Sequence, residues 1–193
     1  AMVHQANLPK RLRTSEVTAW MGPQLHAIQY PVRRGELQNL VVIVQGPAPE
    51  DLDHWDHSAN LPDLPQHLQG ACGYLQDLVQ HVPDVGGEWR LWPVADRQPV
   101  SSETQMAQGL VALLGDAAHP MRPYLAQGAG MAIEDAAELQ SALSMHDLDV
   151  SLRLRRYALN RWQRNAKVQE RSLRNGRIFH ATGPMRWGRD LSL

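Results

Sequence analysis

Hydrophobic residues first gather in two β-rich runs. Residues 25–32 (LHAIQYPV) and 37–44 (LQNLVVIV) are separated by four residues, RRGE, with Gly35 at the third position. This spacing is typical of an antiparallel hairpin. Because residues 40–44 are solidly apolar, we expect the second strand to be central in its sheet. Alternation along the first strand places three side chains on a common face: His26, Ile28 and Tyr30.

Helical periodicity appears in three later segments. One helix is predicted within residues 68–82, with one apolar side: Leu75, Leu78, Val79 and Val82. A second begins at Gly128, and its expected inner stripe is Ala132, Ala136, Leu139 and Leu143, with Glu134, Asp135 and Glu138 on other faces. A third runs from Ser151 to about Asn175, where Gly176 is expected to end it. Its predicted apolar stripe is Leu152, Leu159, Trp162, Ala166 and Leu173.

A short apolar run lies between these helices. Residues 109–114 (GLVALL) are uninterrupted by polar residues and end at Gly115-Asp116. The pattern is typical of a strand buried on both faces that delivers a polar group at its carboxyl end, where open α/β sheets place their sites. Residues 88–94 are predicted to form an edge strand, and residues 3–16, which show no clear period, a loose N-terminal segment.

The bulk composition is that of an ordinary globular protein. The chain has 193 residues, of which 43% are hydrophobic and 20% charged. Cys72 is the single cysteine, which excludes an intrachain disulfide, and no apolar run approaches the roughly 18 residues of a membrane span. With no signal-peptide pattern at the start, we expect a cytoplasmic protein that has no membrane partner.

Charge is distributed unevenly along the chain. Residues 35–89 contain nine acidic residues and no Lys or Arg, whereas residues 151–193 contain eleven Lys or Arg against Glu170 and Asp190. The basic segment could meet nucleic acid, but arginines on a helix more often form a solvated face. We therefore expect no nucleic-acid partner.

One histidine pair has a spacing found in metal sites. His54 and His57 are flanked by Asp53 and Asp56. Zinc sites normally need further ligands at defined spacing, and none is evident, so solvated surface histidines are the favoured interpretation. We expect no metal.

The chemistry is concentrated around residues 115–130. Gly115 and Asp116 put a carboxylate at a strand end, where a sugar or polyol hydroxyl could donate to it. Pro120 and Pro123 stiffen the following loop. The segment Gln127-Gly128-Ala129-Gly130 then brings backbone N–H groups to a helix start, where the dipole favours negative charge. A plain strand, turn and helix, with Asp116 as a cap, explains the same residue types about equally well.

A dinucleotide fingerprint is not present. Gly128 and Gly130 form G-x-G, but Ile133 takes the place of the third glycine, and the segment follows a long loop. No other GxGxxG occurs in the chain.

The motif GDAAHPMRPYLAQGAGMAIEDAAEL resembles the second flavin-contacting motif of the FAD-dependent aromatic hydroxylases, the group that includes salicylate and 3-hydroxybenzoate hydroxylases. YPVRRGELQNLVVIV is similar to the hairpin of their substrate domain, and residues 156–180 with Arg189-Asp190 resemble their C-terminal helix and tail. The resemblance covers nearly the whole chain but only the C-terminal half of that family's polypeptide. The family's GxGxxG unit and its DG motif would lie before residue 1.

The resemblance implies an α/β fold, or α+β for these residues alone. An antiparallel substrate-domain sheet would accompany the C-terminal strand and helices of an FAD/NAD(P)-binding domain. The implied divisions are residues 1–100 for the substrate domain, 101–150 for the FAD-binding part, and 151–193 for the C-terminal helix and tail.

The resemblance also implies site residues. Asp116 would hydrogen-bond the ribityl hydroxyls, Gly115 would allow close approach, and the peptide groups at the helix start would face the flavin pyrimidine ring. The implied cofactor-binding set is Gly115, Asp116, Pro120, Gln127, Gly128, Ala129 and Gly130. His26 and Tyr30 are the candidates to orient or deprotonate a phenolic substrate, and Pro123 would border it. A satisfied sheet histidine is the alternative for His26, and His119 is expected to be structural.

The implied function is an FAD-dependent monooxygenase that uses NADH or NADPH and hydroxylates an electron-rich aromatic acid. Because the GxGxxG half is missing, we expect these residues alone to be inactive and to lack tightly bound FAD. The alternative is a non-catalytic truncated homologue that acts as a binding module. An uncovered strand edge would favour self-association, so we expect a homo-oligomer.

Overall fold

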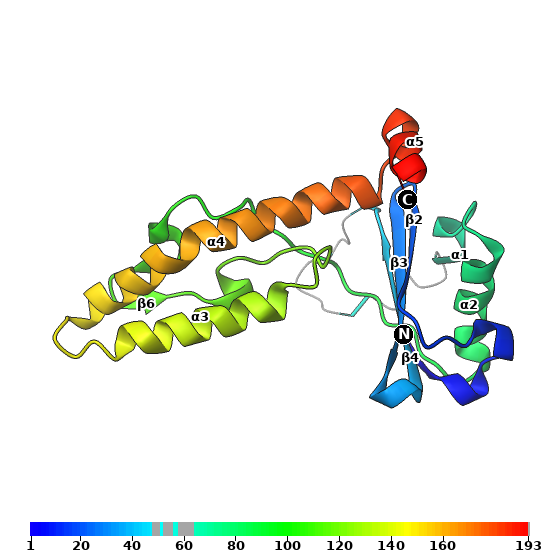
Figure 1. Cartoon of the computed structure of the whole chain (residues 1–193), viewed down its shortest axis with the longest axis horizontal. Coiled ribbons are helices and arrows are strands. Elements are labelled where there is room, and N and C mark those ends of the chain that lie inside the picture. The colour runs from blue at the N-terminus through cyan, green and yellow to red at the C-terminus, as the bar shows by residue number, and fades with distance from the viewer. Residues whose placement is uncertain (48–50, 52–55, 58–63, 193) are drawn as a thin grey trace. The chain divides into compact units, whose positions relative to one another are not determined.

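A computed structural model describes residues 1–47, 51, 56–57 and 64–192 (Figure 1). The chain forms two compact units: unit 1 combines Ala1–Pro93 with Ile178–Leu193, and unit 2 is Val94–Arg177. Among the described residues, no helix combines the length and the apolar character needed to cross a membrane.

Unit 1 is built on a four-stranded antiparallel sheet. Its strands, in spatial order, are β1 (Met2–His4), β4 (Leu37–Val44), β3 (Leu25–Val32) and β2 (Thr18–Gly22). The β3–β4 register, from Leu25 opposite Val44 to Val32 opposite Leu37, confirms the predicted hairpin and the inner position of the second strand. The connecting turn takes three successive residues through the left-handed region, and Gly35, at φ 89°, is the one that does so without strain.

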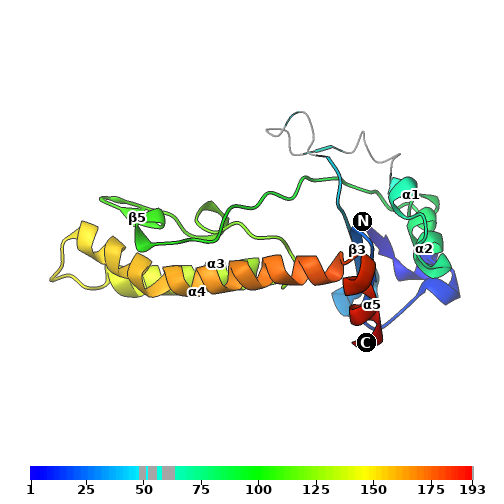
Figure 2. The ribbon, with the colours of Figure 1, turned by 90° about the horizontal axis from the view of Figure 1, so that it is seen from above.

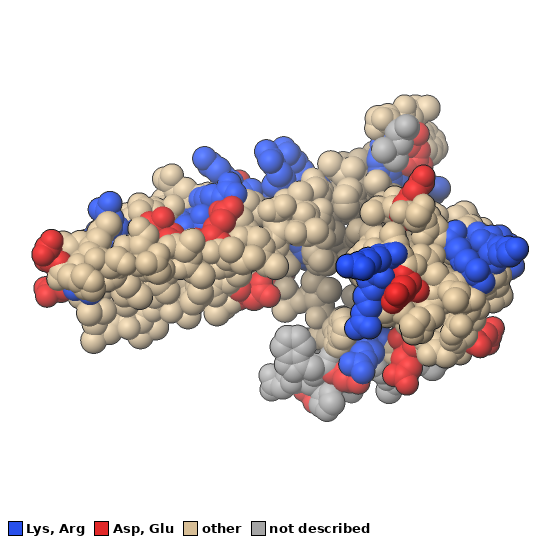
Figure 3. Space-filling view, turned by 60° about the horizontal axis from the view of Figure 1, so that its bottom comes forward, with Lys and Arg blue, Asp and Glu red and all other residues tan. Residues whose placement is uncertain are grey.

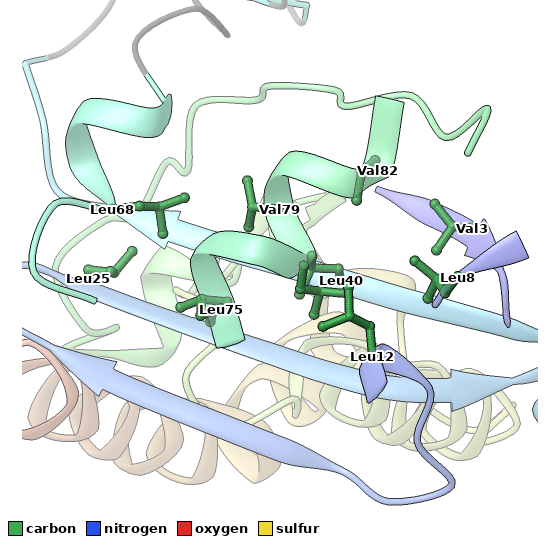
Figure 4. Close-up of a cluster of buried hydrophobic side chains, with 11 residues drawn as sticks. Val3, Leu8, Leu12, Leu25, Leu40, Leu68, Leu75, Val79 and Val82 are labelled. Carbon is green, nitrogen blue, oxygen red and sulfur yellow. The ribbon is translucent and has the colours of Figure 1, made fainter. Parts of the chain in front are cut away.

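Helix α2 (Gly73–Asp84) covers one face of this sheet, and the short helix α1 (Leu64–His67) precedes it. The predicted apolar side of α2 is confirmed, because its buried residues are Leu75, Leu78, Val79 and Val82. They pack on Leu25 and Leu40 of the sheet (Figure 4). This cluster is the core of unit 1.

Two expectations for unit 1 were wrong. The N-terminal segment is not loose, since Val3, Leu8 and Leu12 are buried in the α2 cluster and the 3-10 turns η1 (Gln5–Asn7) and η2 (Lys10–Leu12) order it. Spaced by five and four residues, these three side chains show no regular period. The expected edge strand at 88–94 is reduced, among the described residues, to one bridge between Glu88 and Met2.

The C-terminal helix α5 (Gly183–Ser192) belongs to unit 1. The buried Arg189 guanidinium donates to the carbonyl oxygens of Ile178, Phe179 and Met21. These bonds anchor α5 to the end of the preceding helix and to strand β2.

Unit 2 is mainly helical. Helices α3 (Gly128–Leu143) and most of α4 (Val150–Phe179) form an antiparallel pair (Figure 2). Its smaller elements are η5 (Glu103–Gln105), β5 (Ala107–Gln108), β6 (Val111–Ala112) and η6 (Gly115–Ala117). Met106, Tyr157 and Ala158 lie in its core. With the unit 1 sheet, these helices confirm the predicted combination of an antiparallel sheet and helices.

The strand predicted at residues 109–114 is shorter and more exposed than expected. Only Val111–Ala112 is a strand, and it pairs with β5 alone among the described residues. Leu110 is 75% exposed and Val111 65%. Ala112 packs on the unit 2 core, so these residues leave the strand uncovered on one face only.

The helix faces of unit 2 also differ from prediction. The buried residues of α3 are Met131, Asp135 and Ala142. Of the expected stripe, Ala132 and Leu139 are half-buried, the latter against the unit 2 core, whereas Ala136 and Leu143 are exposed. Of the predicted α4 stripe, Leu152 and Leu159 are exposed, whereas Ala166 is buried and Trp162 packs on the unit 2 core. Its buried positions include a polar series: Arg161, Asn165, Gln169 and Ser172. The buried side of α4 thus carries hydrogen-bonding groups at helical spacing.

Gly176 was expected to end α4, but the helix continues past it to Phe179. It lies inside the helix, and a Cβ placed on it would be 2.3 Å from Cε2 of Tyr124. Real atoms do not approach so closely, so glycine is needed here for close packing of the aromatic ring.

Candidate functional site

The turn η6 and the start of α3 form a corner in unit 2. Gly115 is buried with φ 57°, and a Cβ on it would lie 3.2 Å from Cβ of Ala132, so the helix packs directly on the turn. Asp116, the next residue, is exposed. Its Oδ1 lies 3.9 Å from the position a Cβ would take on Gly128. The structure therefore brings the predicted carboxylate together with the predicted helix start.

The first turn of α3 presents backbone donors at this corner. Helix starts leave their first N–H groups without intrahelical partners, and among the described residues Gln127 supplies no side-chain cap. A Cβ on Gly130 would lie 3.7 Å from Oε1 of Gln127, and Ala129 between the two glycines is exposed. The corner thus combines an acceptor carboxylate with amide donors, which suits a ligand that has both hydroxyl and carbonyl groups.

A buried carboxylate supports the corner, and the sequence reading missed it. Asp135 of α3 is fully buried and accepts from the N–H of Gly115 (3.0 Å), from Nε of Arg161 (2.7 Å) and from Nδ2 of Asn165 (3.2 Å). Its Oδ2 also lies 2.5 Å from Nε2 of His119, which is buried as well. Asp135 therefore ties α3, α4 and the turn before Asp116 together.

This network determines the charge of Asp135. Burial alone raises the pKa of a carboxyl group, but the hydrogen bonds from His119, Gly115 and Arg161 lower the pKa of Asp135 to about 2. Burial and the nearby Asp135 charge raise the pKa of Tyr157, whose hydroxyl donates to the carbonyl of Leu113 (2.9 Å). The Asp135 carboxyl group in the centre of unit 2 therefore stays ionised at neutral pH.

The polar series of α4 holds the loop that follows the corner. Nε2 of Gln169 donates to the carbonyl oxygen of Pro120 (3.2 Å), Oγ of Ser172 to that of Arg122 (2.7 Å), and Nδ2 of Asn175 to that of Tyr124 (3.3 Å). The carbonyl groups of residues 120, 122 and 124 are thus each bound by a side chain from a successive turn of α4. The loop carries both predicted prolines: Pro120 is half-buried and Pro123 is exposed.

The predicted substrate residues lie in unit 1. His26 of β3 is buried on the sheet face opposite the α2 cluster, and its Nδ1 lies 2.7 Å from Nε2 of His180. The Phe179 ring stands edge-on to it, with centroids 5.4 Å apart. Tyr30, four residues along β3, is half-buried on the same face. His180 was missed because it is distant in sequence and no local period marks it.

The surroundings of His26 disfavour its charged form. Burial first, and then the nearby His180, lower its pKa to about 4. The ring is therefore neutral near pH 7.

In the part of the chain that the structure describes, no three or more His, Cys, Asp or Glu side chains gather in a cluster that could hold a metal ion. His54 lies outside the described residues, so the interpretation of His54 and His57 as solvated surface histidines stays a prediction.

Basic and acidic side chains are interspersed on the face shown in Figure 3. Two of the α4 arginines pair with Glu134, Arg161 at 2.8 Å and Arg164 at 2.5 Å. Together they lower the pKa of Glu134 to about 2, Arg164 contributing most. Part of the positive charge of α4 is thus neutralised by Glu134 of helix α3.

Comparison with known proteins identifies the chain's relatives. The family described as "FAD binding domain" matches residues 2–178. A 3-hydroxybenzoate 6-hydroxylase of Polaromonas naphthalenivorans is 36% identical over 183 residues, which are 95% of this chain and 44% of that protein. The chain thus spans about half the length of its curated relatives.

Solved structures share the fold. A salicylate hydroxylase substrate complex has a TM-score of 0.70 at 23% identity and covers 100% of this chain and 50% of its own. Klebsiella pneumoniae HpxO, complexed with FAD and uric acid, has a TM-score of 0.73 at 24% identity, covering 99% of this chain and 46% of its own. The chain therefore belongs to the FAD binding domain family, and within it to the proteins resembling FAD-dependent aromatic hydroxylases.

Proposed function

We propose that these residues supply the ribityl- and isoalloxazine-facing part of an FAD site in an aromatic-ring monooxygenase that uses NADH or NADPH. The observation that supports this most directly is the position of the Asp116 carboxylate beside Gly128, at the open start of α3. A side chain larger than hydrogen at Gly128 would project toward that carboxylate, so the glycine keeps the corner accessible. The donor and acceptor set fits one end of FAD.

In this proposal each group has a limited task. FAD, when bound, supplies the redox chemistry that inserts one oxygen atom of O₂ into the ring. Asp116 accepts hydrogen bonds from ribityl hydroxyls. The amides of Gly128, Ala129 and Gly130 favour negative charge at the pyrimidine edge through the helix dipole. Pro120 and Pro123 border the substrate space, and α4 holds their loop rigid.

For His26 we propose an orienting role toward a phenolic hydroxyl. A neutral imidazole whose pKa is about 4 is a weak base, so it suits hydrogen bonding better than complete proton removal. His180 holds one of its ring nitrogens, and Tyr30 would line the same face.

Ligand binding tests the corner. Purified chain is expected to be colourless and inactive but to bind added FAD weakly, with a Kd on the order of 0.1–1 mM, because these residues contact one end of the cofactor only. Asp116→Asn should weaken binding about tenfold, since a charge-assisted acceptor is lost. Quenching of flavin fluorescence measures both values. Tight stoichiometric FAD would contradict the partial site, and no binding at millimolar flavin would contradict the flavin corner itself.

We infer self-association as the basis of the second candidate function, a non-catalytic binding module. The uncovered β6 region favours it: Leu110 and Val111 are both more than half exposed. The occupant proposed for this surface is a second copy of the chain.

Sedimentation velocity over a concentration series checks this proposal. Wild-type chain is expected to show concentration-dependent association, and Val111→Lys to reduce it, because a charge on an edge strand opposes pairing. Val17→Lys is the control, since Val17 is equally apolar and 72% exposed but lies in unit 1. A monomer at every concentration, or equal effects of both changes, would exclude the β6 region as the interface.

Three further assignments stay predictions from the sequence: the division at residues 100 and 150, the use of NADH or NADPH as reductant, and a cytoplasmic location. The aromatic substrate is proposed by class only, as a phenolic acid. A 36% identical relative is a 3-hydroxybenzoate 6-hydroxylase, which supports that class.

A further inference from the structure

Asp135 links helix α3 to the turn that carries Asp116. It accepts the N–H of Gly115 at 3.0 Å, directly before the exposed Asp116. It also lies on α3, the helix whose first turn forms the other side of the corner. The distance between Asp116 and Gly128 therefore depends on a bond that Asp135 makes to the turn.

The other partners of Asp135 fix its position and charge. Arg161 and Asn165 hold Oδ1 at 2.7 and 3.2 Å, while Gly115 and His119 share Oδ2. Nδ1 of His119 is buried and has no hydrogen-bond partner among the described residues. A proton on that nitrogen would leave a buried donor unpaired, so the ring proton belongs on Nε2, which donates to Asp135.

We propose that Asp135 is a positioning residue of the flavin site: by holding the Gly115 amide and the Nε2–H form of His119, it sets the Asp116 carboxylate against the start of α3. This inference rests on the proposed function, because Asp116 is its point of contact with the ribityl chain. Asp135 itself is fully buried, so in this proposal it acts through Asp116 and not by contact with the flavin.

A double-mutant cycle on riboflavin affinity tests the proposal, since riboflavin carries the ribityl chain and the ring without the nucleotide. Asp116→Asn and Asp135→Asn, measured singly in the full chain, are each expected to weaken binding about tenfold. If Asp135 acts through Asp116, the double variant binds within about twofold of Asp116→Asn alone. Independent, multiplicative losses would overturn the proposal.

Glu134→Gln is the matched control. Glu134 neighbours Asp135 and shares Arg161 with it at 2.8 Å, but its other ion-pair partner is Arg164 at the exposed surface. Its replacement should leave riboflavin affinity within about twofold of wild type. A loss as large as that of Asp135→Asn would show that the arginine network matters in general, and would overturn the specific role of Asp135.

A ligand-free readout separates this proposal from the proposed function. In ¹⁵N NMR spectra, Asp135→Asn should shift the Gly115 and Asp116 amide signals and change the ring-nitrogen signals of His119, whereas Glu134→Gln should not. Unchanged Gly115 and Asp116 signals would overturn the proposal even if riboflavin binds. If wild-type chain binds no riboflavin, the flavin corner fails, and the amide signals alone decide whether Asp135 positions Asp116.

A milder substitution tests the same proposal if Asp135→Asn does not fold. If Asp135→Asn loses its helical circular dichroism, Arg161→Lys replaces it in both measurements. Lysine keeps the charge but cannot keep the forked contacts to Glu134 and Asp135. The same amide shifts in the same direction, with a smaller loss of affinity, are then expected; their absence would count against the proposal.

Discussion

Replacing Arg161 by Met is expected to lower the free energy of unfolding of unit 2 by about 3–5 kcal/mol. The guanidinium side chain is 7% exposed and donates to Asp135, which is fully buried. Removing it leaves the carboxylate without its cationic partner, and a buried uncompensated charge is strongly destabilising. Urea unfolding followed by far-UV circular dichroism measures the loss, because α3 and α4 contribute 16 and 30 helical residues.

Arg164→Met is the control for this change. Arg164 pairs with the same Glu134, but its side chain is 55% exposed, so its loss should cost only about 0–1 kcal/mol. Adding Asp135→Asn to Arg161→Met should recover part of the stability, since the stranded charge is then gone. Equal losses for the two arginines would show that burial of the Asp135 pair is not the cause.

Acidification is expected to destabilise unit 1 by about 3 kcal/mol between pH 6.5 and pH 4, through His26. The pKa of His26 is lowered from 6.5 to about 4 in the folded chain by burial and by His180. Between pH 6.5 and pH 4, His26 is mostly protonated in the unfolded chain but mostly neutral in the folded chain. The contribution is therefore complete above pH 6.5 and is lost as the pH falls towards 4.

Urea unfolding at half-unit pH steps, with Trp fluorescence as the signal, tests this expectation. His26→Gln should flatten the slope in the window, whereas His4→Gln, at an exposed position of β1, should leave it unchanged. Asp135 acts in a separate range, because its stabilisation is present above pH 3.8 and is lost as the pH falls towards 2. A slope in His26→Gln equal to that of the wild type would assign the acid sensitivity to other groups.

Features with a local cause were predictable from the sequence. The β3–β4 hairpin follows from Gly35 at a turn between two β-rich runs. The buried side of α2 follows from the spacing of Leu75, Leu78, Val79 and Val82. The start of α3 at Gly128 was also predicted, and so was the approach of Asp116 to it.

Features that depend on distant partners were not predictable. Asp135 was assigned to an outer face because charged residues are rarely buried. Partners distant in sequence, above all Arg161, 26 positions away, make its burial possible. Gly176 was read as a helix end, since nothing near it in sequence indicates the Tyr124 ring. The apolar stripe of α4 was predicted only in part, because its buried side combines apolar residues with polar ones that bind backbone carbonyls.

The way in which α4 holds the 120–124 loop has a practical consequence for engineering. Gln169, Ser172 and Asn175 bind main-chain carbonyl oxygens, which every amino acid possesses. The anchorage is therefore indifferent to the identity of most loop side chains. The exceptions are Tyr124, which fits against Gly176, and Arg122, which donates to Asp96. Met121 can therefore be randomised in a library while the loop keeps its path, and under the proposed function it is a natural place to alter substrate preference.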